Sequence, residues 1–303
     1  MSKNLRGSLI LLLAAIIWGA AFVAQDKGGA LVGAFTFNAS RWIIGAVFLL
    51  PITIFFTRKK GKKAKENAPF FSKNELLGGS ICGVLLFVSS SFQQFGILLY
   101  DSGEAAAGKS GFITALYIVL VPLFGLFAHK KVPVLTYVSI VVAITGMYLL
   151  CIKDGFSFSA PDILIFLCAL SFTFHILTVD AFSDKANGLK ISVIQMIVCG
   201  IISLMCMFIF ETPKMTDILN AAIPILYAGI LSSGVAYTLQ ILGQKDTNPS
   251  LAAVIMSLES VFAALTGAMF GERMSGKEIL GGALMFLAVL LAQAKLPKKE
   301  ESK

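Results

Sequence analysis

The stretch ITALYIVLVPLFGLFAHKKV at residues 113–132 and the stretch IMSLESVFAALTGAMFGERM at residues 255–274 can be laid over each other without a gap. The offset between them is 142 residues, and the same offset continues through the apolar run that follows each stretch. Self-similarity at a fixed spacing is typical of a duplicated structural unit. The sequence therefore predicts two related halves, residues 1–152 and 153–303, that together form one membrane-embedded domain.

The composition excludes a water-soluble globular protein and a disordered chain. Of the 303 residues, 57% are hydrophobic and 14% are charged, whereas charged residues make up about 25% of a typical soluble domain. A disordered chain would need low hydrophobicity. Ten apolar segments are each long enough to cross a hydrocarbon layer of about 30 Å as a helix. They are residues 6–25, 33–57, 75–99, 104–127, 132–152, 161–182, 190–210, 217–242, 249–270 and 277–295.

Each half holds five of these segments, and five is an odd number, so equivalent helices cross the membrane in opposite directions. We therefore predict an all-α membrane protein with ten transmembrane helices in two inverted five-helix repeats. Two such halves can pack open to one side of the membrane or to the other. That exchange is the geometric basis of alternating access to a substrate near the midplane.

Lysine and arginine indicate how the bundle is oriented. The run RKKGKKAK at 58–65 and most other basic residues between the spans lie on the side of the N-terminus, which the positive-inside rule assigns to the cytoplasm. We expect both termini there, in a bacterial cytoplasmic membrane, with Leu9–Ala24 retained as a span rather than removed as a signal peptide. The 58–65 run suits anionic lipid headgroups, or is simply a solvated loop. Lys130 then faces the cytoplasm and Arg273 the outside.

Four stretches resemble the ten-helix EamA-type transporters of the drug/metabolite transporter superfamily. They are AAIIWGAAFVAQ (14–25), FNASRWIIGAVFLLP (37–51), AGKSGFITALYIVLVPLFG (107–125) and SLESVFAALTGAMFGERMSGKEILGGALM (257–285). The last resembles the family's helix-nine pattern of Leu-Glu, a Gly-Glu-Arg turn and a Gly-rich tenth helix. The resemblance implies a transporter that exports amino acids or other metabolites. Two departures are the Ala128-His129-Lys130 turn, where a Gly-Glu type pair is usual, and Ser260, where Pro often follows Leu-Glu.

Three ionisable residues lie within predicted spans, where each charge costs about 2.5–3.5 kcal/mol on insertion scales. Glu259 lies near the middle of the ninth span and can bind a proton or a cationic amine, or act as a structural carboxylate. Arg41 and Lys109 both suit an anionic substrate group. Arg41 can instead brace helix packing, which is the interpretation we favour, and Lys109 can extend to the outer surface near Glu104.

Polar residues follow two further predicted helices at helical spacing. The third span carries Ser90 and Gln94, and the eighth carries Ser233, Tyr237 and Gln240. After a one-residue gap, the repeat register lays the first pair over the first two members of the second set. Equivalent helices with polar faces at the same depth are expected if both line one cavity. The alternative is a set of hydrogen bonds between helices, each of about 0.6 kcal/mol.

Four other residues complete the predicted site. His175 is near the middle of the sixth span and can titrate with a coupled proton, or simply pack and hydrogen-bond. Trp18 and Tyr117 are candidate aromatic walls of a cavity, or core residues. Tyr117 occupies the repeat position of Glu259, which makes the site chemically asymmetric. Pro122 removes a backbone donor within the fourth span, and we propose it as a hinge.

The expected substrate-binding set is the following: Trp18, Ser90, Gln94, Lys109, Tyr117, His175, Ser233, Tyr237 and Glu259. The function that fits best is a secondary transporter, with Glu259 and His175 as candidate proton carriers. The alternatives are a membrane-embedded enzyme and a channel or scaffold subunit. We expect no cofactor, no metal and no nucleic-acid partner, because the sequence contains no metal-binding spacing, no phosphate-binding loop and no catalytic motif. The substrate, the direction, the coupling ion and the oligomeric state stay open.

Overall fold

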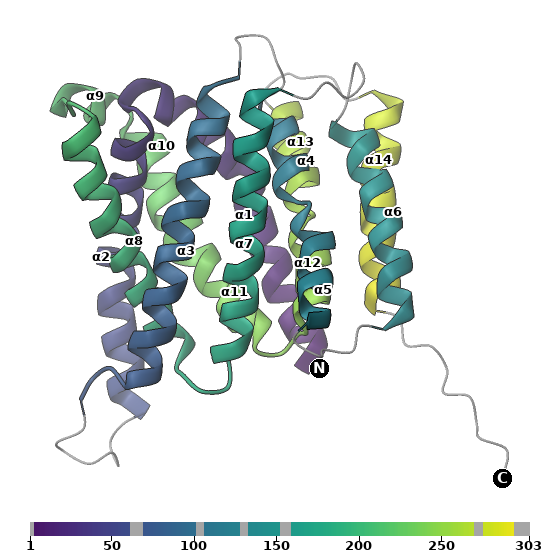
Figure 1. Ribbon diagram of the computed structural model, residues 1–303, viewed down its shortest axis with the longest axis horizontal. Helices are drawn as coiled ribbons and strands as arrows, with labels where there is room; N and C mark the ends of the chain where they lie inside the picture. Colours follow the sequence, from purple (N-terminus) through teal and green to yellow (C-terminus); the bar gives the residue numbers. More distant parts are fainter. Residues whose placement is uncertain are drawn as a thin grey trace, which may run out of the picture.

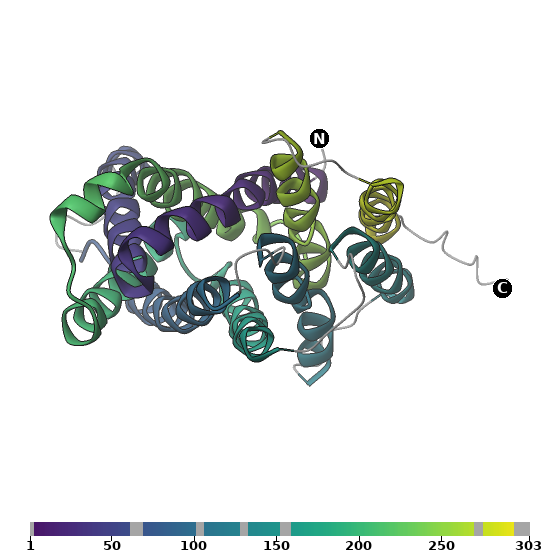
Figure 2. The same cartoon turned by 90° about the horizontal axis from the view of Figure 1, so that it is seen from above.

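The computed structural model describes residues 3–60, 69–100, 106–127, 133–151, 159–269 and 275–293. Throughout these ranges the regular structure is helical. Figure 1 shows the helices side by side, running between two opposite ends of the molecule. Seen from above in Figure 2, most of them are viewed close to end-on. This part of the chain therefore forms the all-α bundle that the composition predicts.

The element bounds agree with the predicted spans to within a few residues, except where a span is interrupted and in α1, which extends seven residues beyond the predicted end at residue 25. In chain order the elements are α1 Lys3–Val32, α2 Ala34–Lys60, α3 Lys73–Leu98, α4 Ala106–Thr114, α5 Tyr117–Phe127, α6 Val134–Cys151, α7 Ala160–Phe182, α8 Gly188–Phe210, α9 Met215–Asn220, α10 Ala222–Leu226, the π-helix η1 Tyr227–Ala236, α11 Tyr237–Gln244, α12 Pro249–Met256, α13 Glu259–Met269 and α14 Gly276–Gln293.

Eight helical segments of the described chain are long and apolar enough to cross a membrane. Two further apolar helices, at Ser110–Leu126 and Val134–Leu150, are shorter. Large apolar side chains cover the outside of the bundle, among them Val134, Phe208 and Ile209, each about 70% exposed. A water-soluble protein does not expose so much apolar surface, whereas helix faces in contact with lipid do.

The fourth and ninth predicted spans are not continuous helices, contrary to expectation. α4 ends at Thr114 and α5 begins at Tyr117, while α12 ends at Met256 and α13 begins at Glu259. At both interruptions the backbone bonds shorten to i→i−3, as in Leu116 N–H to the Ile113 carbonyl. In the second interruption the Ser257 hydroxyl also donates to the Val254 carbonyl, at 2.8 Å, and this local bond competes with helical pairing.

The helices around these interruptions keep the predicted offset of 142 residues. α5 and α13 begin and end at positions that differ by this amount, and so do α6 and α14. α6 and α14 lie side by side in both views, at one end of the molecule (Figures 1 and 2). They approach closely at two glycines, because a Cβ atom on Gly281 would lie 2.6 Å from the carbonyl oxygen of Gly146. Any side chain on Gly281 would therefore force the two helices apart.

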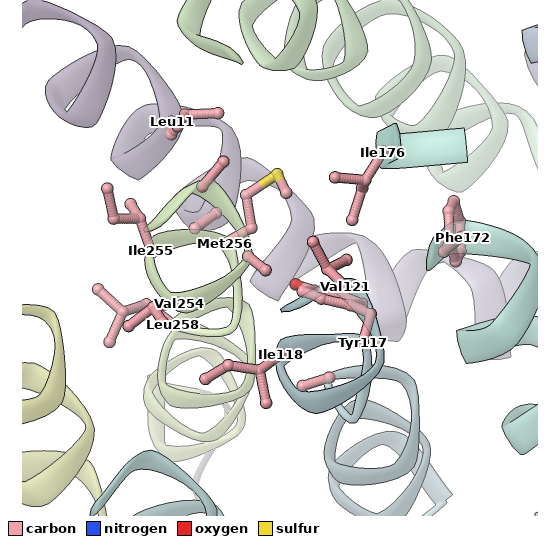
Figure 3. Packing of buried hydrophobic residues seen from close by; sticks show 14 of the residues in the cluster. Leu11, Tyr117, Ile118, Val121, Phe172, Ile176, Val254, Ile255, Met256 and Leu258 are labelled. Atoms are coloured by element: carbon pink, nitrogen blue, oxygen red, sulfur yellow. The ribbon is translucent and has the colours of Figure 1, made fainter. Parts of the chain in front are cut away.

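The main hydrophobic core fills the space where α1, α5, α7 and α12 meet. Figure 3 shows Leu11, Ile118, Ile176 and Met256 converging there. All four side chains are fully buried or nearly so. This core joins helices from both halves of the sequence, and the candidate site lies beside it.

The eighth predicted span is wound as a π-helix over ten residues, Tyr227–Ala236. Glycines allow this segment to approach α2 closely: a Cβ atom on Gly45 would lie 3.0 Å from the Gly229 carbonyl oxygen. Because π-helices have more residues per turn than α-helices, the segment presents different side chains inward from those that α-helical spacing predicts.

Candidate functional site

A cavity lies between the two halves of the sequence, beside the interruptions of the α4–α5 and α12–α13 helix pairs. Its volume is about 30 Å³. Its lining comes from α1, α2, α3, α4, α5 and α7 and from η1, α11, α12 and α13. The cavity is thus built by elements from nearly the whole described chain.

Tyr117 and Glu259 line the cavity as the first residues of α5 and α13. The Tyr117 hydroxyl donates a hydrogen bond of 3.0 Å to Oε1 of Glu259. Both side chains are buried, with exposed fractions of 4% and 5%. In Figure 3 the Tyr117 ring is directed toward α12. The interruption of each helix thus delivers a polar side chain to the same point between the halves.

An aromatic wall surrounds the Tyr237 ring. The centroid of the Trp18 ring lies 4.8 Å from that of Tyr237, with the planes at 62°. The Trp42 and Phe172 centroids lie 5.2 Å and 6.4 Å from it. Trp18 also donates its indole N–H to the Ser232 carbonyl, at 3.4 Å. Because Trp18 comes from α1 and Tyr237 from α11, this wall joins the two halves of the sequence.

Arg41 lines the cavity from α2 and is 2% exposed. Its Nε donates to Oδ1 of Asn38 at 2.9 Å, and its Nη1 donates to Oε1 of Gln25 at 3.3 Å. The guanidinium carbon lies 4.9 Å from the centroid of the Trp42 ring. Among the described residues Nη2 has no hydrogen-bond partner. These contacts are compatible with the bracing role that the sequence favoured, and they also place the guanidinium on the cavity.

Amides and hydroxyls supply the remaining polar lining. Gln93 donates from Nε2 to the Thr114 hydroxyl at 3.3 Å, and both residues line the cavity. Gln240 also lines it, and its buried Oε1 has no hydrogen-bond partner in the described part of the chain. Such groups can bind the polar parts of a small solute in a mostly apolar pocket.

The structure brings four of the predicted site residues together on the cavity: Trp18, Tyr117, Tyr237 and Glu259. Four others lie elsewhere among buried side chains: Ser90, Gln94, His175 and Ser233. Lys109 belongs to α4, but its side chain lies outside the described residues. Pro122 lies inside α5, beyond the interruption at Ala115 and Leu116.

Ser233 does not line the cavity. The prediction placed Ser233 above Tyr237 by α-helical spacing of four residues, whereas the cavity is lined by Ser232 and Tyr237, which are five residues apart. Ser232 and Ser233 both lie in the π-helix, where α-helical spacing does not hold. Ser233 instead faces α2: a Cβ atom added to Gly45 would lie 3.0 Å from the Cβ atom of Ser233.

On α3 the cavity residue is Gln93 and not its neighbour Gln94. Gln94 packs against Gly29 of α1, where a Cβ atom would lie 2.2 Å from its Nε2. That nitrogen donates to the Gln25 carbonyl at 2.8 Å. The absence of a side chain at Gly29 leaves room on α1 for the Gln94 side chain. This contact turns Gln94 toward α1 and sets the orientation of α3 about its own axis. Ser90 lies on the same helix and its carbonyl accepts a bond of 3.2 Å from Nδ2 of Asn38.

His175 is held between α7 and α8, and its Nε2 lies 3.1 Å from Oε1 of Gln195. The cavity face of α7 is formed instead by Phe172 and Ile176. The sequence also did not single out Gln25, Gln93 or Ser232 as site residues. Gln93 and Ser232 could have been considered, since they directly precede Gln94 and Ser233, which were predicted as site residues.

Comparison with known proteins gives a consistent result. The sequence model of the EamA-like transporter family matches residues 5–152 and 159–293. An "Uncharacterized transporter" of Archaeoglobus fulgidus is 30% identical over 296 residues, which cover 97% of this chain and 88% of the relative. The "Uncharacterized transporter YrdR" of Bacillus subtilis is 28% identical over 158 residues, which cover 50% of this chain and 45% of the relative.

The fold is also found among solved structures. One crystal structure matches with a TM-score of 0.75 and 18% sequence identity, and the match covers 95% of this chain and 98% of the other. At this identity the likeness concerns the fold alone.

Proposed function

The chain belongs to the EamA-like transporter family, and from this premise we propose that it exports small metabolites, such as amino acids or amines, as a secondary transporter working by alternating access. The family resemblance that the sequence suggested is thereby confirmed. The chain is a multi-pass membrane protein, and both the family and the names of its relatives are those of transporters rather than enzymes.

Two inverted five-helix halves, with ten spans in all, are the arrangement we propose. The observation that carries the proposal is the hydrogen bond between Tyr117 and Glu259, two residues at equivalent positions of the repeat. Two positions related by a twofold axis touch each other only near that axis. The contact is therefore expected if a pseudo-twofold axis passes between the starts of α5 and α13, with the cavity beside it.

The cavity must enlarge for a metabolite to enter. A water molecule needs about 10–15 Å³ of cavity volume, so the 30 Å³ present here admits about two to three waters. We propose that the interruptions at Ala115–Leu116 and Ser257–Leu258 are the points where each helix bends, because their hydrogen bonding is already irregular. Pro122 lies further along α5 and lacks a backbone N–H, so it can make bending of this helix easier.

We propose Glu259 as the proton-coupling residue. It lines the cavity and is buried, so a substrate and a proton can compete for it. His175 is the weaker candidate, because it lies off the cavity and is hydrogen-bonded to Gln195. Trp18, Tyr117 and Tyr237 would then form the wall against which the substrate packs.

The proposed location is a bacterial cytoplasmic membrane with both termini in the cytoplasm. Its support is the distribution of lysine and arginine, above all the 58–65 run, which we propose as a contact for anionic lipid headgroups. Residues 61–65 of that run, the turns that contain Lys130 and Arg273, and the boundary at 152–153 lie outside the described residues.

Purified protein in liposomes tests the proposal. Amino acids and amines are offered as a panel, and counterflow is recorded with and without an imposed pH gradient. We expect at least one compound to exchange and a pH gradient to drive its accumulation. In inverted membrane vesicles, accumulation driven by the physiological gradient indicates export. Absence of movement for the whole panel would contradict the proposal and favour a membrane enzyme or a scaffold subunit.

A further inference from the structure

We propose that Arg41 is the anion-binding group of the cavity and that it receives the carboxylate of the transported metabolite. This inference rests on the proposed function and narrows it, because it excludes simple amines as good substrates and favours compounds that carry an acid group.

Arg41 lacks a counter-charge in the described part of the chain. It is 2% exposed and lies in α2, a helix with a segment long and apolar enough to span the membrane. A buried guanidinium is costly unless an anion compensates its charge. Among the described residues Arg41 forms no ion pair with a carboxylate. The compensating anion is therefore to be sought in a ligand.

The guanidinium of Arg41 has donors to spare. Arginine has five N–H donors in a planar fork. Asn38 accepts one bond from Nε, and Gln25 accepts one bond from Nη1. Nη2 is buried and has no hydrogen-bond partner among the described residues. Nη2 and the second N–H of Nη1 therefore remain available as donors. Together they can bind the two oxygens of a carboxylate through parallel hydrogen bonds.

The partners of Arg41 hold its side chain in place without neutralising its positive charge. Asn38, which accepts from Nε, donates in turn to the Ser90 carbonyl at 3.2 Å. Gln25, which accepts from Nη1, receives on its backbone carbonyl a bond from Gln94. The Trp42 ring lies 4.9 Å below the guanidinium carbon. All these partners are neutral, so they orient the positive charge and leave it uncompensated. This also gives Ser90 and Gln94 a role as positioning residues.

Two other residues that line the cavity carry complementary groups. Glu259 of α13 is bonded to Tyr117 and forms no ion pair with Arg41 in the described chain. Gln240 presents a buried acceptor, Oε1, that has no hydrogen-bond partner among the described residues. A metabolite with a carboxylate at Arg41 and a donor at Gln240 or Glu259 would connect α2 of the first half with α11 or α13 of the second. One ligand would thus link the two halves.

The test compares matched compounds that differ only in the acid group. Full-length protein in liposomes is offered L-leucine and L-leucinamide, L-phenylalanine and its amide, and L-threonine and its amide, and the ratio of acid to amide exchange is measured. We expect the wild type to prefer the acid member of at least one pair by about tenfold, the effect of one charge-assisted hydrogen bond. Arg41→Gln should bring this ratio close to one. Lys190→Gln is the matched control, because it removes a positive charge away from the cavity, and it should keep the wild-type ratio.

The ratio is the readout because a merely destabilised protein loses exchange of both members equally. If Arg41→Gln does not fold, Arg41→Lys is tested instead. Lysine keeps the positive charge but lacks the planar guanidinium, and we expect its ratio of acid to amide exchange to lie below that of the wild type. A wild type that exchanges acids and amides equally, or an Arg41 variant that folds and keeps the full preference, would overturn the assignment while transport itself stands. A wild type that exchanges no member of any pair, and no compound of the wider panel, overturns the proposed function and this inference with it.

Discussion

The Tyr117 hydroxyl and the Glu259 carboxylate are hydrogen-bonded at 3.0 Å across the 142 residues that separate equivalent positions of the two halves. Each residue is the first of its helix, directly after an interruption. A phenol and an acid therefore meet where the two halves of the chain meet, on the wall of the cavity.

Replacing Glu259 by Gln should separate proton coupling from exchange. The amide keeps the size of the side chain and can still accept from Tyr117, but it cannot release a proton in the working range of pH. We expect accumulation driven by a pH gradient to fall at least tenfold, while counterflow at equal pH persists. Asp26→Asn is the control, since Asp26 is an exposed acid on α1. Unchanged proton-driven accumulation in the Glu259 variant would remove Glu259 from this role.

Replacing Tyr117 by Phe should destabilise the protein. The change removes the donor that reaches the buried Glu259, and such a loss costs about 1–3 kcal/mol. We expect a lower Tm in detergent for Tyr117→Phe. The control is Tyr148→Phe, because Tyr148 is 41% exposed on α6. Equal melting of the two variants would mean that the bond contributes little.

Replacing Gly281 by Ala should loosen the α6–α14 pair. The added Cβ would lie 2.6 Å from the Gly146 carbonyl oxygen and from the Leu150 backbone nitrogen, so the helices must separate. Strain of this kind costs about 1–3 kcal/mol and should lower Tm. Gly125→Ala is the matched control, because nothing lies within 4 Å of its Cβ position, and alanine is the better helix former by up to about 1 kcal/mol. A Gly281 variant as stable as the Gly125 variant would contradict the observed packing.

Neighbouring glutamines on α3 should respond differently to the same change. Gln93 lines the cavity and donates only a long bond of 3.3 Å to the Thr114 hydroxyl, so Gln93→Leu should raise KM for exchange and lower Tm less than Gln94→Leu does. Gln94 donates to the Gln25 carbonyl at 2.8 Å, so Gln94→Leu should lower Tm by removing that bond. Both variants are assayed for exchange and melting side by side. A reversal of the two phenotypes would mean that α3 is rotated from the position described.

Cysteines introduced at Lys130 and Arg273 should react from opposite faces of the membrane. These are equivalent ends of the two predicted halves, and inversion sends them to opposite sides. In a cysteine-free background, an impermeant thiol reagent should label Arg273→Cys in intact cells and Lys130→Cys only in inverted vesicles. Labelling of both from the same face would end the inverted-repeat proposal.

Much of the fold could be predicted because helices that span a lipid bilayer are long and apolar, and such segments can be recognised in a sequence. The positions of Trp18, Tyr117, Tyr237 and Glu259 followed from the same regularity. Where helices depart from regular winding, prediction failed. The cavity is lined by Ser232 rather than Ser233, and both residues lie in a π-helix that residue spacing does not reveal. On α3 the cavity residue is Gln93 rather than Gln94, which packs against Gly29 in another helix. The role of Arg41 depends on which of its donors neighbours satisfy, which only tertiary structure reveals.

The unlike pair at the starts of α5 and α13 has an energetic consequence. If the two proposed halves were identical in sequence, a twofold rotation would relate the inward-facing form to the outward-facing form. Both forms would then have the same free energy, and the empty protein would spend equal time in each. A phenol on one side and a carboxylate on the other lift this degeneracy. The resting protein must then prefer one side of the membrane, and exchanging the two residues should reverse that preference.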